Sequence, residues 1–221
     1  MSWNWEVIGE TGLQFFGKVS ASISHEIKNV IAIINENAGL LEDLIARSEK
    51  GIPLDPERLR TQANRIIKQV RRGDDIVKGM NRFAHSVDEP LRQTDVNDSL
   101  ALTCALSNRF ASMRGVALEL DPSPTQVPII TNPFFLQNLI WLCPDFAMGS
   151  TGTGKAVSLK AGKTEGGAEI RFSKLEDLAA ADIESFPGER ETALLQALRA
   201  DLVINKEMGE LRLTFPVQAE G

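Results

Sequence analysis

Two stretches of apolar residues, each repeating at three- and four-residue steps, constrain the fold more than any other feature of this sequence. The first stretch has Ala38 filling a gap in an otherwise aliphatic seam, which consists of Ile23, Ile27, Val30, Ile34, Leu41 and Ile45. The second keeps a strict seven-residue repeat through Leu59, Ala63, Ile66, Val70, Gly73, Val77, Met80 and Ala84. Such spacing predicts two amphipathic helices with coiled-coil-like seams.

The segment between the two repeats predicts how the helices are connected. EKGIPLDP, residues 49–56, is a short turn rich in helix breakers, and Asp55 before Pro56 is typical of an N-cap followed by proline at the first helical position. We therefore expect an antiparallel helical hairpin from about Leu13 to Ser86. One pairing cannot bury both long seams, so a second copy of the chain is expected to complete a dimeric four-helix bundle.

The pattern changes after Pro90, which divides the chain into predicted domains 1–89 and 90–221. Alternating or short apolar runs predict strands at 116–120, 127–130, 156–161, 168–172, 201–205 and 210–217. Helices are expected at 133–148 and at about 189–200. The fold class is therefore α+β: a helical hairpin, then an α/β sandwich with helices packed on one sheet.

Composition limits the classes of function. The 221 residues carry a net charge of −6, which makes nucleic acid a poor partner, and no apolar run is long enough to span a membrane. The N-terminus lacks the pattern of a secretion signal, and the two cysteines, Cys104 and Cys143, have no metal-type spacing. We expect a cytoplasmic protein whose cysteines are packing residues. The basic stretch 58–82 is either a solvated helix face or a docking surface for an acidic partner.

His25 lies within the first repeat but away from its seam. At about 100° per residue, the seam centres near Ile23 and Ile27, so His25 is predicted to be exposed on the opposite side. Asn29 follows one turn later on roughly the same face, while Glu26 flanks the seam. An isolated exposed histidine is most often only part of a solvated face.

The residues around His25 belong to a longer resemblance. SHEIKN, with the matching second helix and the exit FAHSVDEPLRQTDVNDSL, resembles the dimerisation and phosphotransfer domain of sensor histidine kinases. RGVALELDP, NPFFLQNLIWL and MGELRLTFPV are similar in pattern to the ATP-binding domain that follows in that family. The resemblance covers nearly the whole chain from about Gly12. Val30 departs from it, because the family usually has proline there.

The resemblance implies roles for four residues. His25 would be the nucleophile that takes up a phosphoryl group, and Glu26 would hydrogen-bond the other ring nitrogen and accept a proton. Lys28 would help to neutralise phosphoryl oxygens, although a solvated lysine is the plainer interpretation. Asn29 would position water for dephosphorylation of a partner aspartyl phosphate, although an exposed asparagine needs no function.

The family's nucleotide-binding residues are replaced here. The asparagine that holds magnesium is expected in LCPDFAM, residues 142–148, which has Pro144 and Asp145 but no asparagine. SKLEDLAAADIESF contains Asp177 without the flanking glycines, and Gly188 is the only glycine between Phe172 and Gly209. Asn138 is the remaining alternative as a displaced magnesium ligand.

One glycine-rich stretch resembles a phosphate-binding loop. GSTGTGKA, residues 149–156, nearly matches the P-loop pattern, but Ala156 stands where a magnesium-binding serine or threonine is needed. A P-loop also follows a strand and opens a helix, whereas this stretch is expected to follow a helix and lead into a strand. We interpret it as a flexible helix-to-strand connection.

These observations predict a histidine phosphotransferase of a two-component phosphorelay. His25 would pass phosphoryl groups between response-regulator receiver domains, with no metal or cofactor on this chain because the receiver brings its own magnesium. The alternatives are an active sensor-type histidine kinase with an atypical ATP site, and a non-catalytic pseudokinase scaffold that binds a receiver. His85 is interpreted as a helix-end residue interacting with the helix dipole. Trp3, Trp5, Phe15 and Phe16 are expected to pack the start of the first helix.

Overall fold

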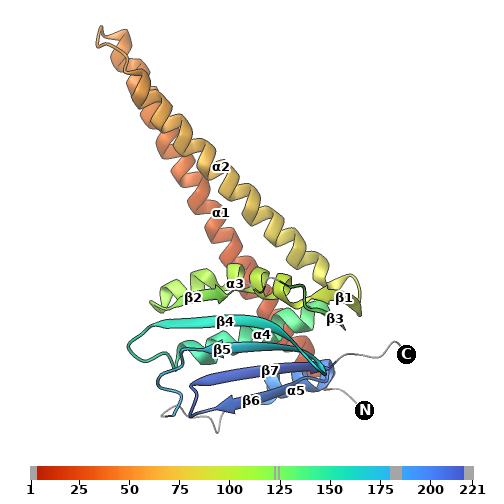
Figure 1. The fold of residues 1–221 in the computed structure, drawn as a ribbon. Coiled ribbons are helices and arrows are strands. Elements are labelled where there is room, and N and C mark those ends of the chain that lie inside the picture. Colours follow the sequence, from red (N-terminus) through yellow and green to blue (C-terminus); the bar gives the residue numbers. More distant parts are fainter. Residues whose placement is uncertain (1–3, 122, 124, 180–185, 217–221) are drawn as a thin grey trace. The chain divides into compact units, whose positions relative to one another are not determined.

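The computed structural model describes residues 4–121, 123, 125–179 and 186–216 (Figure 1). The chain separates into two compact units. The helical unit is Ser20–Arg82, and the sheet unit combines Met1–Val19 with Phe83–Gly221. The predicted domain boundary lies between residues 89 and 90, whereas the two units meet between 19 and 20 and between 82 and 83. The start of the first helix therefore belongs to the sheet unit.

The helical unit is the predicted antiparallel hairpin. Helix α1 runs over Trp5–Glu49 and α2 over Pro56–Ala84. Asp55 caps α2 as expected, since its carboxylate accepts a hydrogen bond of 2.9 Å from the backbone N–H of Glu57. Helix α1 begins earlier than the predicted Leu13, because Asn4 accepts hydrogen bonds from the first turn of the helix through its carbonyl and its side chain.

The seam between the two helices differs from the predicted repeat. On α2, the half-buried positions are Leu59, Gln62, Ile66, Gln69, Gly73, Ile76, Gly79 and Ala84. Gly73 allows close contact, because a Cβ there would lie 3.3 Å from the side chain of Val30. The other half of the predicted repeat stays exposed in a single chain: Val70 at 54%, Val77 at 44% and Met80 at 38%. The helices therefore pair along one stripe of α2 and leave a second apolar stripe open.

The sheet unit contains two sheets where one was predicted. Strands β1 (Arg92–Asp95) and β3 (Pro128–Thr131) form an antiparallel pair of their own. The larger sheet has the order β2-β4-β5-β7-β6, in which β2 and β4 are parallel and the other pairs antiparallel. Its strands are β2 Ala117–Asp121, β4 Ala156–Thr164, β5 Gly167–Ser173, β6 Asp201–Asn205 and β7 Glu210–Pro216.

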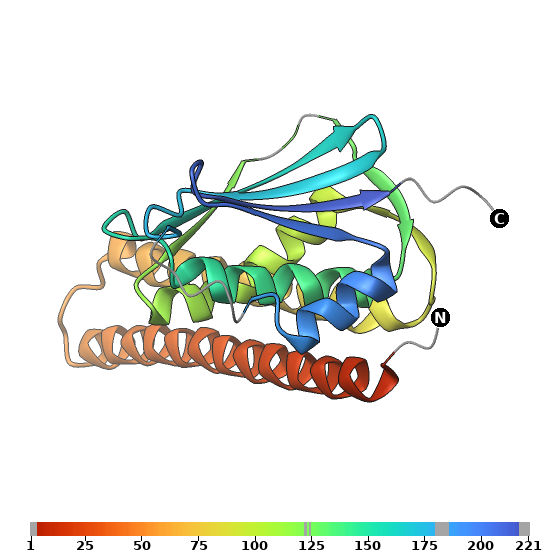
Figure 2. The ribbon, with the colours of Figure 1, turned by 90° about the horizontal axis from the view of Figure 1, so that it is seen from below.

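Helices α3 (Val96–Met113), α4 (Pro133–Met148) and α5 (Glu189–Leu198) complete the sheet unit, with a short 3₁₀ turn at His85–Val87. Figure 2 shows α4 and α5 side by side on one face of the larger sheet. Every second residue of the three central strands is buried on the sheet's inner face: Val157, Leu159, Ala161, Ala168, Ile170, Phe172, Leu211, Leu213 and Phe215. The predicted α/β sandwich is thereby confirmed.

The first turns of α1 are part of the core of the sheet unit. Phe15 is fully buried, and its ring centroid lies 5.2 Å from that of Phe83, 5.6 Å from Phe134 and 5.4 Å from Trp141. Gly12 permits this packing, because a Cβ there would lie 3.1 Å from the ring of Phe134. The predicted packing role of Phe15 is confirmed, whereas Trp3 lies outside the described residues.

Candidate functional site

His25 lies on α1 in the helical unit, and its side chain is exposed. Ser22 and Ile23, on the preceding turn, are buried, with Ser22 only 1% and Ile23 4% exposed. The helix thus turns its apolar side inward and presents the imidazole to solvent, as the periodicity predicts. An exposed imidazole on a rigid helix is accessible to a second protein without any rearrangement of the core.

Asn29 contacts the ring of His25. Its side-chain amide nitrogen lies 3.2 Å from Nδ1 of the histidine, which is the contact expected for residues four apart on a helix. Amide nitrogen and oxygen exchange places by a half-turn of the amide, so Asn29 can donate to a bare Nδ1 or accept from a protonated one. In the second arrangement the lone pair is on Nε2, which is the nucleophilic form of the ring.

Glu26 faces the second helix. Its carboxylate lies 3.8 Å from the guanidinium of Arg72 on α2, and the Glu26 side chain is 25% exposed. The described contact of the His25 ring is therefore with Asn29, while Glu26 forms an ion pair between the two helices. Lys28 is exposed and forms no ion pair with any described residue.

This geometry brings two of the four predicted residues into direct contact. His25 and Asn29 form a nucleophile with a neutral polar neighbour, and the adjoining Glu26–Arg72 pair supplies charges of both signs. An imidazole with one free nitrogen can attack an electrophilic phosphorus atom, and an amide beside it can hold the other nitrogen in one tautomer. The arrangement suits group transfer from a partner that carries its own electrophile.

Asp145 and Asn138 of α4, the residues considered as nucleotide ligands, lie in different surroundings. The carboxylate of Asp145 lies 2.7 Å from the guanidinium of Arg114, which also donates to the backbone carbonyl of Asp145. Asn138 is 0% exposed, and neither atom of its amide has a hydrogen-bond partner in the described part of the chain. Asp145 is thus exposed but paired with a cation, and the Asn138 amide is enclosed by the core.

The glycine-rich loop after α4 lies against a carboxylate of the protein itself. A Cβ on Gly152, whose φ is +58°, would meet the Glu176 carboxylate at 3.0 Å, and a Cβ on Gly154 would meet it at 3.1 Å. The hydroxyl of Thr153 donates to the same carboxylate at 3.4 Å. Asp177 is anchored beside it, because its backbone N–H donates to the carbonyl of Ser150. The loop connects helix α4 to strand β4, as predicted.

In the described part of the chain, no group of three histidine, cysteine, aspartate or glutamate side chains could hold a metal ion. Cys104 is half-buried and Cys143 fully buried, both as free thiols. Burial raises the pKa of Cys104 to about 12, and burial together with the nearby charge of Glu191 raises the pKa of Cys143 as well.

His85, the other histidine, has a partner that the sequence interpretation missed. Its Nδ1 lies 2.7 Å from the carboxylate of Asp88, three residues later, and both side chains are largely exposed. His85 follows the last residue of α2, as the sequence predicts, but the expectation that it has no acidic neighbour is wrong.

No helix among the described residues combines the length and the apolar character that crossing a bilayer requires.

Comparison with known proteins places the chain among distant structural neighbours. No family profile and no curated protein sequence matches it. Among solved structures, the chain is similar to the histidine kinase AdeS of Acinetobacter baumannii, with 12% identity, a TM-score of 0.49, and coverage of 83% of this chain and 96% of that one.

Two further neighbours have comparable scores. The ATP-binding domain of PrrB from Mycobacterium tuberculosis aligns at 20% identity with a TM-score of 0.46, over 59% of this chain and all of that one. The histidine kinase ThkA, solved in complex with the response regulator TrrA, aligns at 17% identity with a TM-score of 0.46, over 93% of this chain and 63% of that one. At such low identities and scores, the function must be argued from the residues of the site.

Proposed function

We propose that this chain is a histidine phosphotransferase of a two-component phosphorelay, in which His25 takes a phosphoryl group from the receiver domain of one response regulator and passes it to another. The observation that carries the proposal is the exposed His25 ring, which contacts Asn29 at Nδ1 and has no hydrogen bond at Nε2 to any described residue. A transfer histidine needs this arrangement, because one nitrogen must be held while the other attacks.

In the proposed transfer, the lone pair of Nε2 attacks the phosphorus of a receiver aspartyl phosphate. The N–P bond forms as the acyl P–O bond breaks, and the aspartate leaves as a carboxylate. The ring carries one positive charge until the Nδ1 proton, held against the amide oxygen of Asn29, is lost to water. The reverse sequence returns the phosphoryl group to a second receiver aspartate. Magnesium is supplied by the receiver, so this chain needs no metal or cofactor.

The residues around the site support an acidic partner. Arg72 is paired with Glu26, and Lys28 is two residues from Glu26 in the chain. Helix α2 carries further exposed basic residues, namely Arg58, Arg60, Arg65, Lys68, Arg71, Lys78 and Arg82. Positive charge on an exposed helix steers an acidic surface toward it and sets its orientation. In this proposal, Lys28 offsets phosphoryl charge, and Glu26 with Asn29 can also position water, which would give the site phosphatase activity.

Transfer from ATP is a poorer account of the same residues. Of the residues considered as nucleotide ligands, Asp145 is paired with Arg114, and Asn138 is enclosed in the core. Asp177 lies against the glycine-rich loop. An electron-rich carboxylate at that loop opposes the approach of a phosphate group. We therefore infer that the sheet unit has a structural or docking role instead of serving as an ATP-dependent kinase.

The exposed stripe on α2 supports a homodimer. Val70, Val77 and Met80 lie on one side of α2, and Ile31 and Ile67 are also about half exposed within the single chain. Contiguous apolar surface of this kind on a helical hairpin is covered most simply by the same surface of a second copy. The dimer proposed is a four-helix bundle with one His25 on each chain.

The test uses receiver domains labelled with radioactive acetyl phosphate as donors. We expect acid-labile phosphate to appear on the wild-type chain and on His85→Ala, the control at the only other histidine, but not on His25→Ala. Label that appears from magnesium and ATP alone would replace this proposal by the kinase alternative. Receivers that bind wild type and His25→Ala equally, without transferring label to either, would leave the scaffold alternative.

A further inference from the structure

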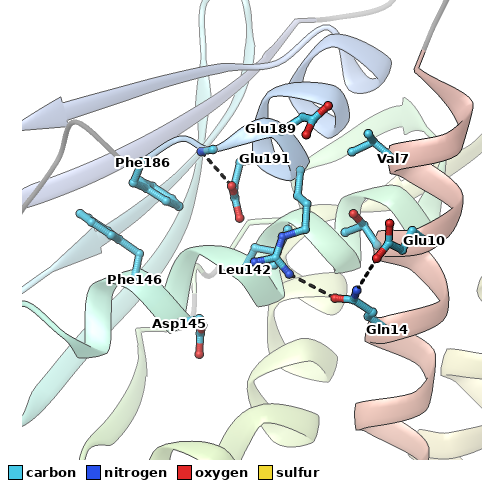
Figure 3. Close-up of a pocket in the computed structure, with 12 residues that line it drawn as sticks. Val7, Glu10, Gln14, Leu142, Asp145, Phe146, Phe186, Glu189 and Glu191 are labelled. Carbon is cyan, nitrogen blue, oxygen red and sulfur yellow. Dashed lines mark hydrogen bonds between the residues drawn. The ribbon is translucent and has the colours of Figure 1, made fainter.

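A pocket of about 590 Å³ lies in the sheet unit, between the first turns of α1, the end of α4 and the start of α5 (Figure 3). Pockets that bind small molecules in proteins have volumes of this order. None of its lining residues belongs to the His25 site. They come from three stretches, 7–14, 142–146 and 186–191, of which the first is more than a hundred residues away from the other two. The fold assembles it from segments that the sequence analysis did not connect.

Negative charge dominates the described lining. Four carboxylates contribute to it, from Glu10, Asp145, Glu189 and Glu191, against one basic residue, Arg190. The Glu191 side chain is nearly buried, and its carboxylate accepts a hydrogen bond of 2.9 Å from the backbone N–H of Gly188. Asp145 is paired with Arg114, and the other lining residues still include three carboxylates, those of Glu10, Glu189 and Glu191, against one basic group.

The guanidinium of Arg190 is already engaged within the lining. It donates to the side-chain oxygen of Gln14 at 3.2 Å, and the amide nitrogen of Gln14 donates to the carboxylate of Glu10 at 3.0 Å. Both hydrogen bonds are drawn in Figure 3, where they meet at Gln14 on α1. The bond between Arg190 and Gln14 uses one N–H of the guanidinium. The carboxylates of the lining oppose the binding of an anionic ligand.

An aromatic wall faces this polar side. The rings of Phe146 and Phe186 are stacked, with centroids 4.1 Å apart and an interplanar angle of 5°. In Figure 3 they lie across the view from Glu10 and Gln14, and Val7 and Leu142 add further apolar surface to the lining. The pocket therefore combines apolar and aromatic surface on one side with carboxylates on the other, which suits a ligand with both an apolar body and a positive charge.

Thr11 supplies an unsatisfied polar group at the same place. Its side chain lines the pocket and is only 2% exposed, yet its hydroxyl has no hydrogen-bond partner in the described part of the chain. A helical threonine ordinarily donates to the carbonyl four residues earlier. Because a buried hydroxyl without a partner is costly, a ligand group that bonds to it gains more than it would at an exposed position.

We propose that this pocket binds a small organic cation, namely an ammonium group carried on an aromatic or apolar body. The ammonium would lie among the carboxylates of Glu10 and Glu191 and donate to the Thr11 hydroxyl. The body would lie against Phe146 and Phe186. A nucleoside triphosphate is disfavoured here by charge, so the site is distinct in chemistry from the nucleotide site that the sequence resemblance would suggest. The inference does not depend on phosphotransfer by His25.

Calorimetric titration of the full chain tests the proposal with matched probes. Benzylamine, phenethylamine and tryptamine are the cations, 2-phenylethanol is the neutral counterpart of phenethylamine, and 3-phenylpropionate is the anion. We expect at least one amine to bind saturably, with the neutral counterpart about tenfold weaker and the anion weaker still. Equal binding of amine and alcohol, saturable binding of the anion or of magnesium–ATP, or no saturable binding by any of the three amines would overturn it.

Variants locate the binding in the pocket. Glu10→Gln removes a lining charge and is expected to weaken amine binding about fivefold, whereas Glu6→Gln, on the same helix but outside the lining, should leave it unchanged. Thr11→Val retains the size of the side chain and should also weaken binding, with circular dichroism checking the fold. Equal effects of Glu6→Gln and Glu10→Gln would contradict the assignment. His25→Ala should bind amine as wild type does, which separates this test from that of the phosphotransferase.

Discussion

The side-chain amide of Asn29 lies 3.2 Å from Nδ1 of His25, one helical turn before it, while the carboxylate of Glu26 lies 3.8 Å from the guanidinium of Arg72. Glu26, the next residue after His25, thus forms an ion pair with the second helix, and Asn29, four residues after His25, contacts the imidazole ring. In the proposed transfer, Asn29 is therefore the residue that positions His25, and substitutions can separate its effect from that of Glu26.

Asn29→Ala is expected to slow phosphoryl transfer from a labelled receiver to His25 by about ten- to a hundredfold, because the ring loses the group that holds its tautomer. Asn29→Asp restores an acceptor at Nδ1 and should recover most of the rate. Asn35→Ala, an exposed asparagine on the same helix, is the control. Rapid-quench measurement of labelled chain checks this. A full rate in Asn29→Ala together with a large loss in Glu26→Gln would assign the role to Glu26 instead.

Val77→Asp is expected to convert the proposed dimer to monomer, because a charge placed on the exposed α2 stripe cannot be buried in a four-helix bundle without a large desolvation cost. Val77 is 44% exposed in the single chain, so the substitution should leave the hairpin itself folded. Sedimentation velocity measures the mass, with Asn64→Asp as a control at an exposed polar position. A wild-type chain that sediments as a monomer would refute the dimer.

The thiols give a prediction that depends on pH. The pKa of Cys104 is raised from 9.0 to about 12, so at pH 8 its thiolate population is about a thousandth of that of an ordinary thiol. Alkylation of the native chain by iodoacetamide should be correspondingly slow at both cysteines and become fast on unfolding.

The same shift links stability to pH. Above pH 9 an unfolded chain ionises its thiols while the folded chain keeps them protonated, so this contribution to the free energy of unfolding is present below pH 9 and falls as pH rises toward 12. Cys104→Ser should flatten part of that decline in urea titrations. Rapid alkylation of native Cys104 at pH 8 would show that its burial is incomplete in solution.

Periodicity predicted the parts of the fold that have a strong local pattern. The helix expected at 133–148 is α4, which spans the same residues, because Asn132 caps its first turn and Pro133 fits the first helical position. The strand DLVIN is likewise β6 to the residue. In both cases the local signals and the tertiary packing agree.

Two elements were not predicted, for different reasons. Strand β1, with the sequence RQTD, has no apolar alternation and forms only by pairing with β3. Helix α3 did carry a usable signal, since the Asp95 carboxylate caps it by accepting from the N–H of Asn97 at 2.9 Å. Apolar residues recur along α3 as well, but the stretch was interpreted only as an exit from the hairpin.

The candidate site was predictable where it depends on one helix and unpredictable where it depends on two. Exposure of His25 and its contact with Asn29 follow from helical geometry alone. The pairing of Glu26 with Arg72 needs the register between α1 and α2, which the repeat did not define, because Val70 and Val77 continue the same pattern as Ile66 and Gly73. The pocket at Thr11 needs the fold of the sheet unit, and no sequence pattern reports it.

Glu176 changes what the glycine-rich loop means for anyone who scans sequences for nucleotide-binding motifs. Its carboxylate rests against Gly152 and Gly154 and accepts from Thr153, so the negative group beside this loop belongs to the chain itself. A loop can therefore have a sequence close to the P-loop pattern while a carboxylate of the same chain lies where a phosphate would bind. In such proteins the residue that excludes the phosphate lies outside the motif, and only the folded structure shows that the two are in contact.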